Sequence, residues 1–360
     1  MAALLIMAAV ALLAIIVFRE IATPPECTPF ISTAATLSLS EPSKSESVLP
    51  PPEVQDAEAT VSFIGNCSPA SLLGSDVHGT FNSFLEEADE IVNPFAAITE
   101  TDSLTVASCN AVLAPEGSLP ETDIPDESTW LLGSETNAML YKSLGIDAVS
   151  LETTHSLDYA EEGRSATKLA LTTGGTQPFD SASPYITEID GISVCILSAR
   201  FKEEQPSIAG LVRIAASMYD VVIVYGQADD SGNQPSEWRM TGAREMINAG
   251  AKAVIEYTDR VQQIVRYGGG YIAYSLGNFI DGSTPPTDKQ VSMILSLTIK
   301  RDGKKDKISL SYNAIPCVSS NDGWLPEPLH DPADAEPTDS EPTETAEADK
   351  TADNIDQSKK

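Results

Sequence analysis

The chain has 360 residues and a formal net charge of −31, from 53 acidic and 22 basic side chains. This acidity argues against a nucleic-acid partner, because binding to phosphates requires clustered lysine and arginine. The five cysteines are scattered and form no CxxC pair, which excludes a disulfide framework and a zinc knuckle. Cys67, Cys109 and Cys195 lie in or beside apolar runs, so we expect them to be buried.

The first distinct segment is apolar. Residues 2–18, AALLIMAAVALLAIIVF, carry no charge and have a length at the short end of what crosses a bilayer. No A-x-A-like cleavage site follows, so residues 1–20 are predicted to be an uncleaved transmembrane signal anchor, with a cleaved signal peptide as the alternative. The protein is then expected at the cell membrane, single-pass, with its domain on the extracytoplasmic face. Flanking charge alone does not fix this orientation, since Arg19 follows the run and no cation precedes it.

Two segments of biased composition flank the central region. Residues 21–59 are rich in Ser, Pro, Thr and Glu, which predicts a disordered linker. Residues 325–360 are acidic and Pro-rich with almost no large apolar side chains, so they cannot bury enough surface to offset the entropy of ordering. We therefore expect a globular domain over residues 60–320 and a disordered acidic tail. A role of this tail in contacting cations or the cell wall is a further hypothesis.

The central region alternates short β-rich runs with helical patterns. Strands are predicted within 59–66, 103–113, 146–151, 220–226, 251–257 and 270–280, helices within 80–92, 134–145, 161–175, 208–219 and 236–250, and hairpins within 185–200 and 291–317. Repeated strand–helix units with late hairpins indicate a layered α/β sandwich of mixed sheets flanked by helices. In such sheets ligands bind at the carboxyl ends of parallel strands, where the polar turns of this sequence fall.

One of these turns, SLETTHSLDYAEEG at 150–163, contains one of the three histidines of the chain. His155 has Asp158 three residues later, just before a predicted helix. The simplest interpretation is that this pair orients the loop through hydrogen bonds. A residual acid–base role of His155 is the alternative.

Five segments, in chain order, resemble the bacterial capsule-synthesis family of CapA or poly-γ-glutamate synthesis (PgsA) type. YSLGNF at 274–279 is identical to the family motif, and 150–163 is similar to S-L-A-N-N-H-x-L-D-Y-G-x-x-G. NAGAKAVIEYTDRVQQI at 248–264 resembles D-A-G-A-D-x-V-I-G-H-H-P-H-V-x-Q. VSFIGN stands where the family has a strand ending in Gly-Asp, and SLTVASCNAVL where it has D-L-x-x-x-N-L-E. The resemblance covers about 61–280 and implies a sandwich similar to calcineurin-like metallophosphoesterases.

The resemblance also implies a metal site, and here the sequence departs from the family. Divalent metals are held by carboxylates and neutral imidazoles. Most of the corresponding positions carry neutral or cationic side chains instead, and only His155, Asp158 and Asn278 are retained. We therefore predict no metal or other cofactor and a vestigial pocket, formed by Asn66, Ser108, Asn110, Thr153, Thr154, His155, Gln227, Tyr257, Arg260 and Asn278.

Two further features have competing interpretations. Arg260 either contributes, with polar neighbours, to a pocket for a carboxylate or phosphate, or it pairs internally with Asp259 or Asp158. Asp76 and His78 resemble a D-x-H-G metal turn, but no buried strand directly precedes them, so they are interpreted as the start of a surface helix.

These features favour a pseudoenzyme over an enzyme without deciding between them. The first hypothesis is a membrane-anchored, non-catalytic component of capsule or poly-γ-glutamate synthesis or export. Its expected partners are the membrane and, as the resemblance implies, an anionic cell-surface polymer or other synthesis subunits. The alternative is a metal-dependent phosphoesterase-like hydrolase or transferase, which would hold Mn, Fe or Zn with an unconventional ligand set.

Overall fold

The computed structural model describes residues 55–74, 79–88, 90–119, 129–202, 207–230, 232–283, 291–319 and 323–329. All of them belong to one compact unit, residues 52–360. The predicted anchor, nearly all of the linker and the tail beyond 329 lie outside the described residues, so those predictions stay untested. Within the described ranges, no helix combines the length and the apolar character needed to cross a membrane.

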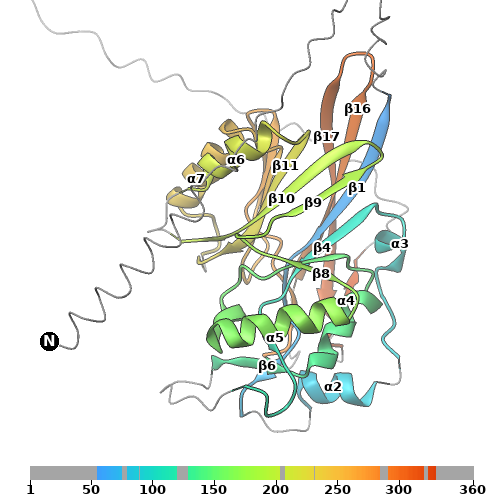
Figure 1. Ribbon diagram of the computed structural model, residues 1–360, viewed down its shortest axis with the longest axis vertical. Coiled ribbons are helices and arrows are strands. Elements are labelled where there is room, and N and C mark those ends of the chain that lie inside the picture. Colours follow the sequence, from blue (N-terminus) through green and yellow to red (C-terminus); the bar gives the residue numbers. More distant parts are fainter. Residues whose placement is uncertain are drawn as a thin grey trace, which may run out of the picture. The chain divides into compact units, whose positions relative to one another are not determined.

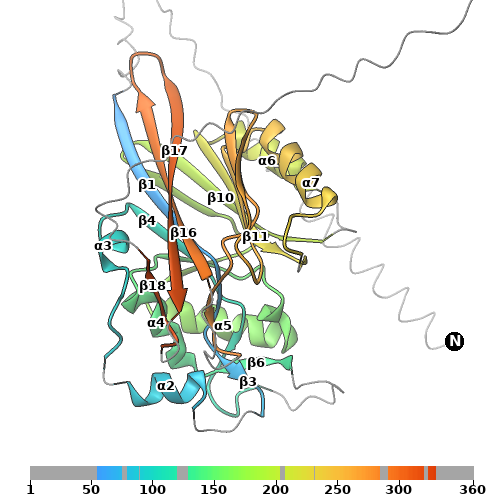
Figure 2. The ribbon, with the colours of Figure 1, turned by 180° about the vertical axis from the view of Figure 1, so that it is seen from behind.

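Among the described residues, the larger sheet has seven strands (Figure 1). Its order is β18 (Pro326–Pro328), β17 (Lys307–Ser319), β16 (Val291–Asp302), β1 (Ala57–Ile64), β4 (Leu104–Ser108), β7 (Ala148–Ser150) and β8 (Gln177–Phe179). Strands β1, β4, β7 and β8 run parallel to one another. β16 pairs antiparallel with β1, β17 with β16, and β18 with β17. Figure 2 shows the long β16–β17 hairpin beside β1.

The second sheet has six strands in the described part of the chain. Its order is β13 (Ile264–Tyr267), β14 (Gly270–Ala273), β12 (Ala253–Tyr257), β11 (Val221–Ala228), β10 (Ile192–Phe201) and β9 (Tyr185–Ile189). Two small sheets complete the described strands, one of β15 (Asn278–Asp281) with β2 (Asn66–Ser68), the other of β3 (Ser71–Leu72), β6 (Leu131–Gly133) and β5 (Val112–Leu113).

Two of the described helical segments begin at a side-chain cap. Thr80 caps α2 in a reciprocal capping box with Ser83, and Ser134 caps the 3-10 turn η2 that leads into α4. The described helices and 3-10 turns are α2 (Phe81–Glu87), α3 (Ala96–Thr99), η2 (Glu135–Ala138), α4 (Met139–Ser143), η3 (His155–Leu157), α5 (Ala160–Thr173), α6 (Ala209–Ala216) and α7 (Glu237–Asn248).

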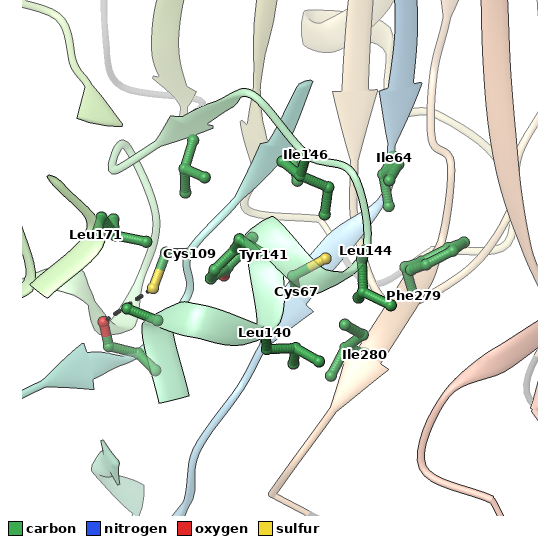
Figure 3. Packing of buried hydrophobic residues seen from close by; sticks show 14 of the residues in the cluster. Ile64, Cys67, Cys109, Leu140, Tyr141, Leu144, Ile146, Leu171, Phe279 and Ile280 are labelled. Carbon is green, nitrogen blue, oxygen red and sulfur yellow. Dashed lines mark hydrogen bonds between the residues drawn. The ribbon is translucent and has the colours of Figure 1, made fainter. Parts of the chain in front are cut away.

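The two main sheets pack face to face because alternate side chains of their strands point to opposite sides. Phe63, Val106 and Leu297 of the larger sheet share one core cluster with Ile223 and Ile255 of the second. The outer face of the larger sheet is covered by α2, α4 and α5, as Figure 3 shows for Leu140 and Tyr141 of α4 and for Leu144 directly after it. On the outer face of the second sheet lie α6 and α7 (Figure 1). The predicted layered α/β sandwich with mixed sheets is confirmed.

Local predictions from turn chemistry are confirmed as well. Asp190 and Gly191 have positive φ and connect β9 to β10, as expected for an Asp-Gly hairpin. Gly268 and Gly269 form the turn between β13 and β14. The described cysteines are buried thiols with no disulfide among them: Cys67, Cys109, Cys195 and Cys317.

Three predicted boundaries are wrong. Segment 270–280 is not one strand, because β14 ends at Ala273 and β15, which starts at Asn278, pairs with β2 in another sheet. The predicted tail begins too early, since Trp324 and Leu325 pack against the core and β18 pairs with β17. The predicted linker extends too far, since β1 begins at Ala57. In the last two cases composition missed short segments that gain their order from pairing with a neighbouring strand.

Candidate functional site

The predicted site residues follow the carboxyl ends of neighbouring parallel strands. Asn66 comes directly after β1 and Gly65, Ser108 ends β4, and the loop of Thr153, Thr154 and His155 follows β7. In the second sheet, Gln227 lies near the end of β11 and Tyr257 ends β12.

Asn66 and Asn278 are joined directly although 212 positions separate them in the chain. Asn66 Nδ2 donates to Asn278 Oδ1 at 2.6 Å, and Asn278 Nδ2 donates to Asp281 Oδ2 at 2.9 Å. An ionised carboxylate can only accept, so Asp281 fixes the orientation of the Asn278 amide and, through it, that of Asn66. The side-chain oxygen of Asn66, Oδ1, is buried and has no hydrogen-bond partner among the described residues.

Hydrogen bonds to Gln227, Asn110 and Cys109 hold the loop after β7. Gln227 Oε1 accepts from Thr154 N at 2.6 Å and from Thr154 Oγ1 at 3.0 Å, and Asn110 Oδ1 accepts from His155 N at 2.9 Å. Thr153 Oγ1 donates to the carbonyl of Cys109 at 2.9 Å. The structure therefore brings Asn110, Thr153, Thr154, His155 and Gln227 together, with both amide oxygens used to support the loop backbone.

His155 and Asp158 form a second local unit. His155 Nδ1 lies 2.9 Å from Asp158 Oδ2, and the side chains are 24% and 10% exposed. The same carboxylate oxygen accepts from Leu131 N at 3.0 Å, so Asp158 connects the imidazole to β6. An imidazole held through Nδ1 keeps one ring nitrogen for another partner. This geometry fits the predicted loop-orienting role and leaves the acid–base alternative open.

Ser108 and Tyr257 lie deeper, among buried side chains. Ser108 Oγ accepts from Cys67 N at 3.1 Å, and its carbonyl accepts from Tyr141 OH at 2.7 Å. The ring of Tyr257 packs on that of Tyr225, with centroids 4.9 Å apart. Burial raises the pKa of Tyr257, so its hydroxyl stays protonated. These residues shape the floor of the site and offer no anionic ligand.

The side chain of Arg260 binds two residues outside the predicted pocket, Asn233 and Asp259. Its side chain is 59% exposed, with NH1 donating to Asn233 Oδ1 at 2.6 Å and Nε 3.5 Å from Asp259 Oδ2. Of the two interpretations of Arg260, the structure thus shows the internal ion pair, with Asp259, and not the pocket for a carboxylate or phosphate. The physical reason is that Asn233 and Asp259 satisfy the guanidinium in a wet environment, at a smaller cost of desolvation than insertion among buried groups.

The site does not fit a divalent metal ion. Among the described residues, no three His, Cys, Asp or Glu side chains are grouped to hold one. Asp76 and His78 lie outside that part of the chain, and the described Thr80 caps α2 as expected for a helix start. The amide oxygens of Asn110 and Gln227 already accept backbone N–H groups. Within the described part of the chain, Asn66 Oδ1 and the Tyr257 hydroxyl are the oxygens of the site that are buried without a hydrogen-bond partner. Two neutral groups do not make the ligand set that a divalent metal requires.

Sequence reasoning missed two residues that bind predicted site residues. Asp281 anchors the Asn278 amide, and its position three residues after Asn278, beyond the apolar Phe279 and Ile280, is a signal visible in the sequence. Asn233, the partner of Arg260, lies in a polar loop between β11 and α7 and gives no such signal.

Comparison with known proteins assigns the family. The model of the family described as "Bacterial capsule synthesis protein PGA_cap" matches residues 60–283. No curated protein matches the chain. A solved structure of a hypothetical protein from Thermus thermophilus is similar with a TM-score of 0.42 and 13% identity, over 71% of this chain and 99% of that one. Another, described as "Putative 5'-Nucleotidase from Staphylococcus aureus in complex with alpha-ketoglutarate", has a TM-score of 0.41 and 10% identity, over 76% of this chain and 55% of that one.

The family match spans more than half of the 360 residues and contains every residue of the candidate site. The YSLGNF motif within it places Asn278 against Asn66. The chain belongs to the bacterial capsule synthesis protein family.

Proposed function

We propose that the protein is a membrane-anchored, extracytoplasmic and non-catalytic component of cell-surface polymer synthesis or export, with a polymer of the capsule or poly-γ-glutamate kind. Family membership supports the role in the synthesis of a cell-surface polymer. The apolar segment 2–18 supports the proposal that the protein is anchored in the membrane. The expected partners are the membrane, the anionic polymer and other subunits of the synthesis machinery.

One observation carries the non-catalytic part of the proposal. At the strand ends, the oxygens of Asn110 and Gln227 bind backbone N–H groups of residues 154 and 155 instead of facing a common point. Moving these oxygens onto a metal would leave two donors without partners, at a cost of about 1–3 kcal/mol each. The site is therefore stabilised as a loop support. No metal and no cofactor is part of the proposed function.

Metal content of the full-length protein, purified in detergent, tests this proposal. We expect less than stoichiometric Mn, Fe and Zn, and no rise in the unfolding temperature when Mn²⁺ is added. Stoichiometric metal that disappears, together with phosphodiesterase activity, in a His155→Ala variant would instead establish the metal-dependent hydrolase. Asp158→Asn serves as a second variant, because it removes the partner of the imidazole but keeps an oxygen acceptor for Leu131 N.

The role in polymer synthesis has its own test in cells. Deletion of the gene is expected to reduce surface polymer, and both the native chain and the His155→Ala variant are expected to restore it. A chain lacking residues 2–18 is expected to fail, because the domain would no longer be held at the membrane. Restoration by the native chain but not by His155→Ala would contradict a non-catalytic role.

A further inference from the structure

A cavity of about 610 Å³ lies beside α7, on the face of the second sheet that α6 and α7 cover (Figure 1). Its walls are the end of β10, the segment leading into α6, and α7 with its N-cap residue Ser236. It shares no lining residue with the candidate functional site. A volume between about 300 and 1,000 Å³ is typical of small-molecule sites in proteins.

The cavity is open because the facing positions are small. β10 presents Ala199, and α7 presents Gly242 and Ala243. A Cβ atom added to Gly242 would meet no atom within 4 Å, so this helix position borders open space. Elsewhere in the same layer, Val212 and Ile247 fill the space between helices and sheet. The opening is thus local to the region where β10 ends and α7 begins.

The apolar part of the lining contains two aromatic side chains. Trp238 comes from α7 and Phe201 from β10, so the two rings belong to different walls, with Ile208 and Met246 also lining the cavity. Aromatic rings pack well against another ring and attract a cation over their faces. This part of the cavity suits the apolar body of a ligand.

The cations at the end of β10 are already committed. Arg200 Nε donates to Asp229 Oδ1 at 3.2 Å, and its NH2 donates to Oδ2 of the same carboxylate at 3.0 Å. Lys202 Nζ lies 3.8 Å from Asp229 Oδ2. A two-point pair between a guanidinium and a carboxylate is strong and directional. These side chains therefore offer little attraction to an anionic ligand.

The floor of the cavity has one cation for two carboxylates. Arg239 and Glu256 line the cavity and are 2% and 1% exposed. Arg239 Nε donates to Glu256 Oε2 at 2.7 Å, and NH1 donates to Asp230 Oδ2 at 3.2 Å. When both acids are ionised, this cluster carries an excess negative charge. A buried charge without a counter-ion is costly, so a second cation at this position would be stabilised.

One oxygen of the floor lacks a donor. Glu256 Oε2 accepts from Arg239, but within the described part of the chain Glu256 Oε1 has no hydrogen-bond partner. Since Glu256 is buried and lines the cavity, the cavity is where this oxygen can meet a donor. A buried acceptor without a partner is unfavourable. An ammonium group would supply both the missing donor and the missing positive charge.

The wall formed by α7 adds further negative charge. Glu237 and Glu245 line the cavity, are exposed, and form no ion pair with any other described residue. Together with Asp229 and Asp230, which bind lining residues directly, the charged groups comprise five carboxylates and three cations. A cleft with an excess of one sign of charge concentrates ligands of the opposite sign. The cavity is therefore suited to a cation.

We propose that this cavity binds an apolar primary amine, a ligand with one ammonium group, no carboxylate and an aromatic body of the size of phenylethylamine. The ammonium group donates to Glu256 Oε1 and balances the second carboxylate of the floor, and the ring packs with Trp238 and Phe201. The proposal concerns a second site and does not depend on the function proposed for the strand ends.

Calorimetric titration of the full-length protein in detergent tests the ligand class, with each probe titrated into detergent alone as the reference. The first probe is 2-phenylethylamine. Its controls are 2-phenylethanol, which lacks the charge, phenylethyltrimethylammonium, which lacks the N–H donors, and 3-phenylpropionate, which has the opposite charge. The amine is expected to bind at least about tenfold more tightly than each control. Equal affinity for the amine and any control, or no binding of the amine up to about 10 mM, would overturn the proposal.

The pH dependence of binding identifies Glu256 as the partner. Burial raises the pKa of this carboxyl to about 7, and Arg239 opposes the shift only in part. The other ionisable groups that act on it are those of Asp230 and Tyr274. Below pH 7 the ammonium group must displace the proton of Glu256, so the affinity for 2-phenylethylamine should rise about tenfold from pH 6 to pH 8. The amine itself stays protonated throughout. Equal affinity at both pH values would contradict this contact.

Glu256→Gln tests the same contact by substitution. The variant keeps an acceptor for Arg239 Nε but cannot ionise. It is expected to bind 2-phenylethylamine at least about tenfold more weakly than the native chain at pH 8, with no dependence on pH between 6 and 8. Native affinity in a folded Glu256→Gln protein would overturn the proposal.

Two glycine variants locate the binding independently of charge. Gly242→Trp fills the cavity without a clash at Cβ and is expected to abolish binding of 2-phenylethylamine. Gly210→Trp is the matched control, since Gly210 on α6 also borders open space but does not line the cavity, and it is expected to bind normally. Unchanged binding by a folded Gly242→Trp protein would rule out this cavity as the site. If either cavity variant fails to fold, the probe series and the pH dependence of the native chain still decide.

Discussion

Arg239 Nε donates to Glu256 Oε2 at 2.7 Å, and both side chains are buried. The same guanidinium binds Asp230 Oδ2 at 3.2 Å, Gln262 Oε1 at 3.0 Å and the carbonyl of Tyr274. A single side chain of α7 thus binds four other segments, namely the loop after β11, strand β12, the segment between β12 and β13, and the chain where β14 gives way to the YSLGNF turn. That turn contains Asn278, so Arg239 stabilises the segment that carries this residue of the candidate site.

Replacement of Arg239 by Met is expected to destabilise the protein by about 3–5 kcal/mol, because it leaves the Glu256 carboxylate buried without its cation. Urea unfolding at neutral pH measures the loss. Arg260→Met is the matched control, since that side chain is 59% exposed, and should cost less than about 0.5 kcal/mol. The double variant Arg239→Met with Glu256→Leu should be more stable than Arg239→Met alone. Equal losses for Arg239→Met and Arg260→Met would contradict the buried network.

Asp102 predicts a pH dependence of stability. Burial raises the pKa of this carboxyl from 3.8 to about 6, and the hydrogen bond from Ser62 opposes the shift only in part. The folded state therefore holds the proton more tightly than the unfolded state. The contribution of the Asp102 carboxyl to stability is fully present below pH 3.8 and is lost as the pH rises through about 6.

The measurement for Asp102 is the free energy of unfolding across this pH range, for the native chain and for Asp102→Asn. The variant keeps an acceptor for Ser62 but cannot titrate, so its stability should fall less steeply with rising pH. If the free energy of unfolding depends on pH in the same way in both proteins, Asp102 does not contribute to this dependence.

Ala160 is expected to be a destabilising residue in the native chain. It has a φ of 51° at the start of α5, where the resembled family motif carries Gly. The left-handed region costs an L-residue about 1–2 kcal/mol, partly balanced by the greater freedom of an unfolded glycine. Ala160→Gly should therefore raise the free energy of unfolding by about 0.5–1 kcal/mol. Ala166→Gly, inside the same helix, should lower the free energy of unfolding by a similar amount. If both variants are less stable than the native chain, the backbone at Ala160 is not strained.

Gln227 tests the support of the loop after β7. Gln227→Leu removes the acceptor of Thr154 N and Oγ1 and should cost about 1–2 kcal/mol. Hydrogen exchange should accelerate at the Thr154 amide, because local opening no longer breaks this bond. Gln177→Leu, at an exposed position of β8, is the control and should leave exchange at Thr154 unchanged. Unchanged exchange in Gln227→Leu would show that the bond does not hold the loop.

The sequence by itself determined the features that depend on near neighbours. The helical spacing, the hairpin at 185–200 and the apolar strand runs each depend on a few neighbouring residues, so alternation and turn chemistry predicted these elements. The motifs were also sufficient to indicate the family, because they lie in the expected order. Ser108, Thr153 and Gln227 were correctly expected at strand ends, where chain order alone places them.

Only the tertiary structure decided how the side chains are used. Asn66 binds Asn278 across 212 positions, and the guanidinium of Arg260 turns to Asn233 rather than to the strand ends. The network of hydrogen bonds around Arg239 and the open space beside Gly242 could not be predicted from the sequence either. Each of these outcomes depends on which loops meet when sheets and helices pack, and on which buried group most needs a partner. These contacts join segments far apart in the chain, so the pattern of neighbouring residues does not predict them.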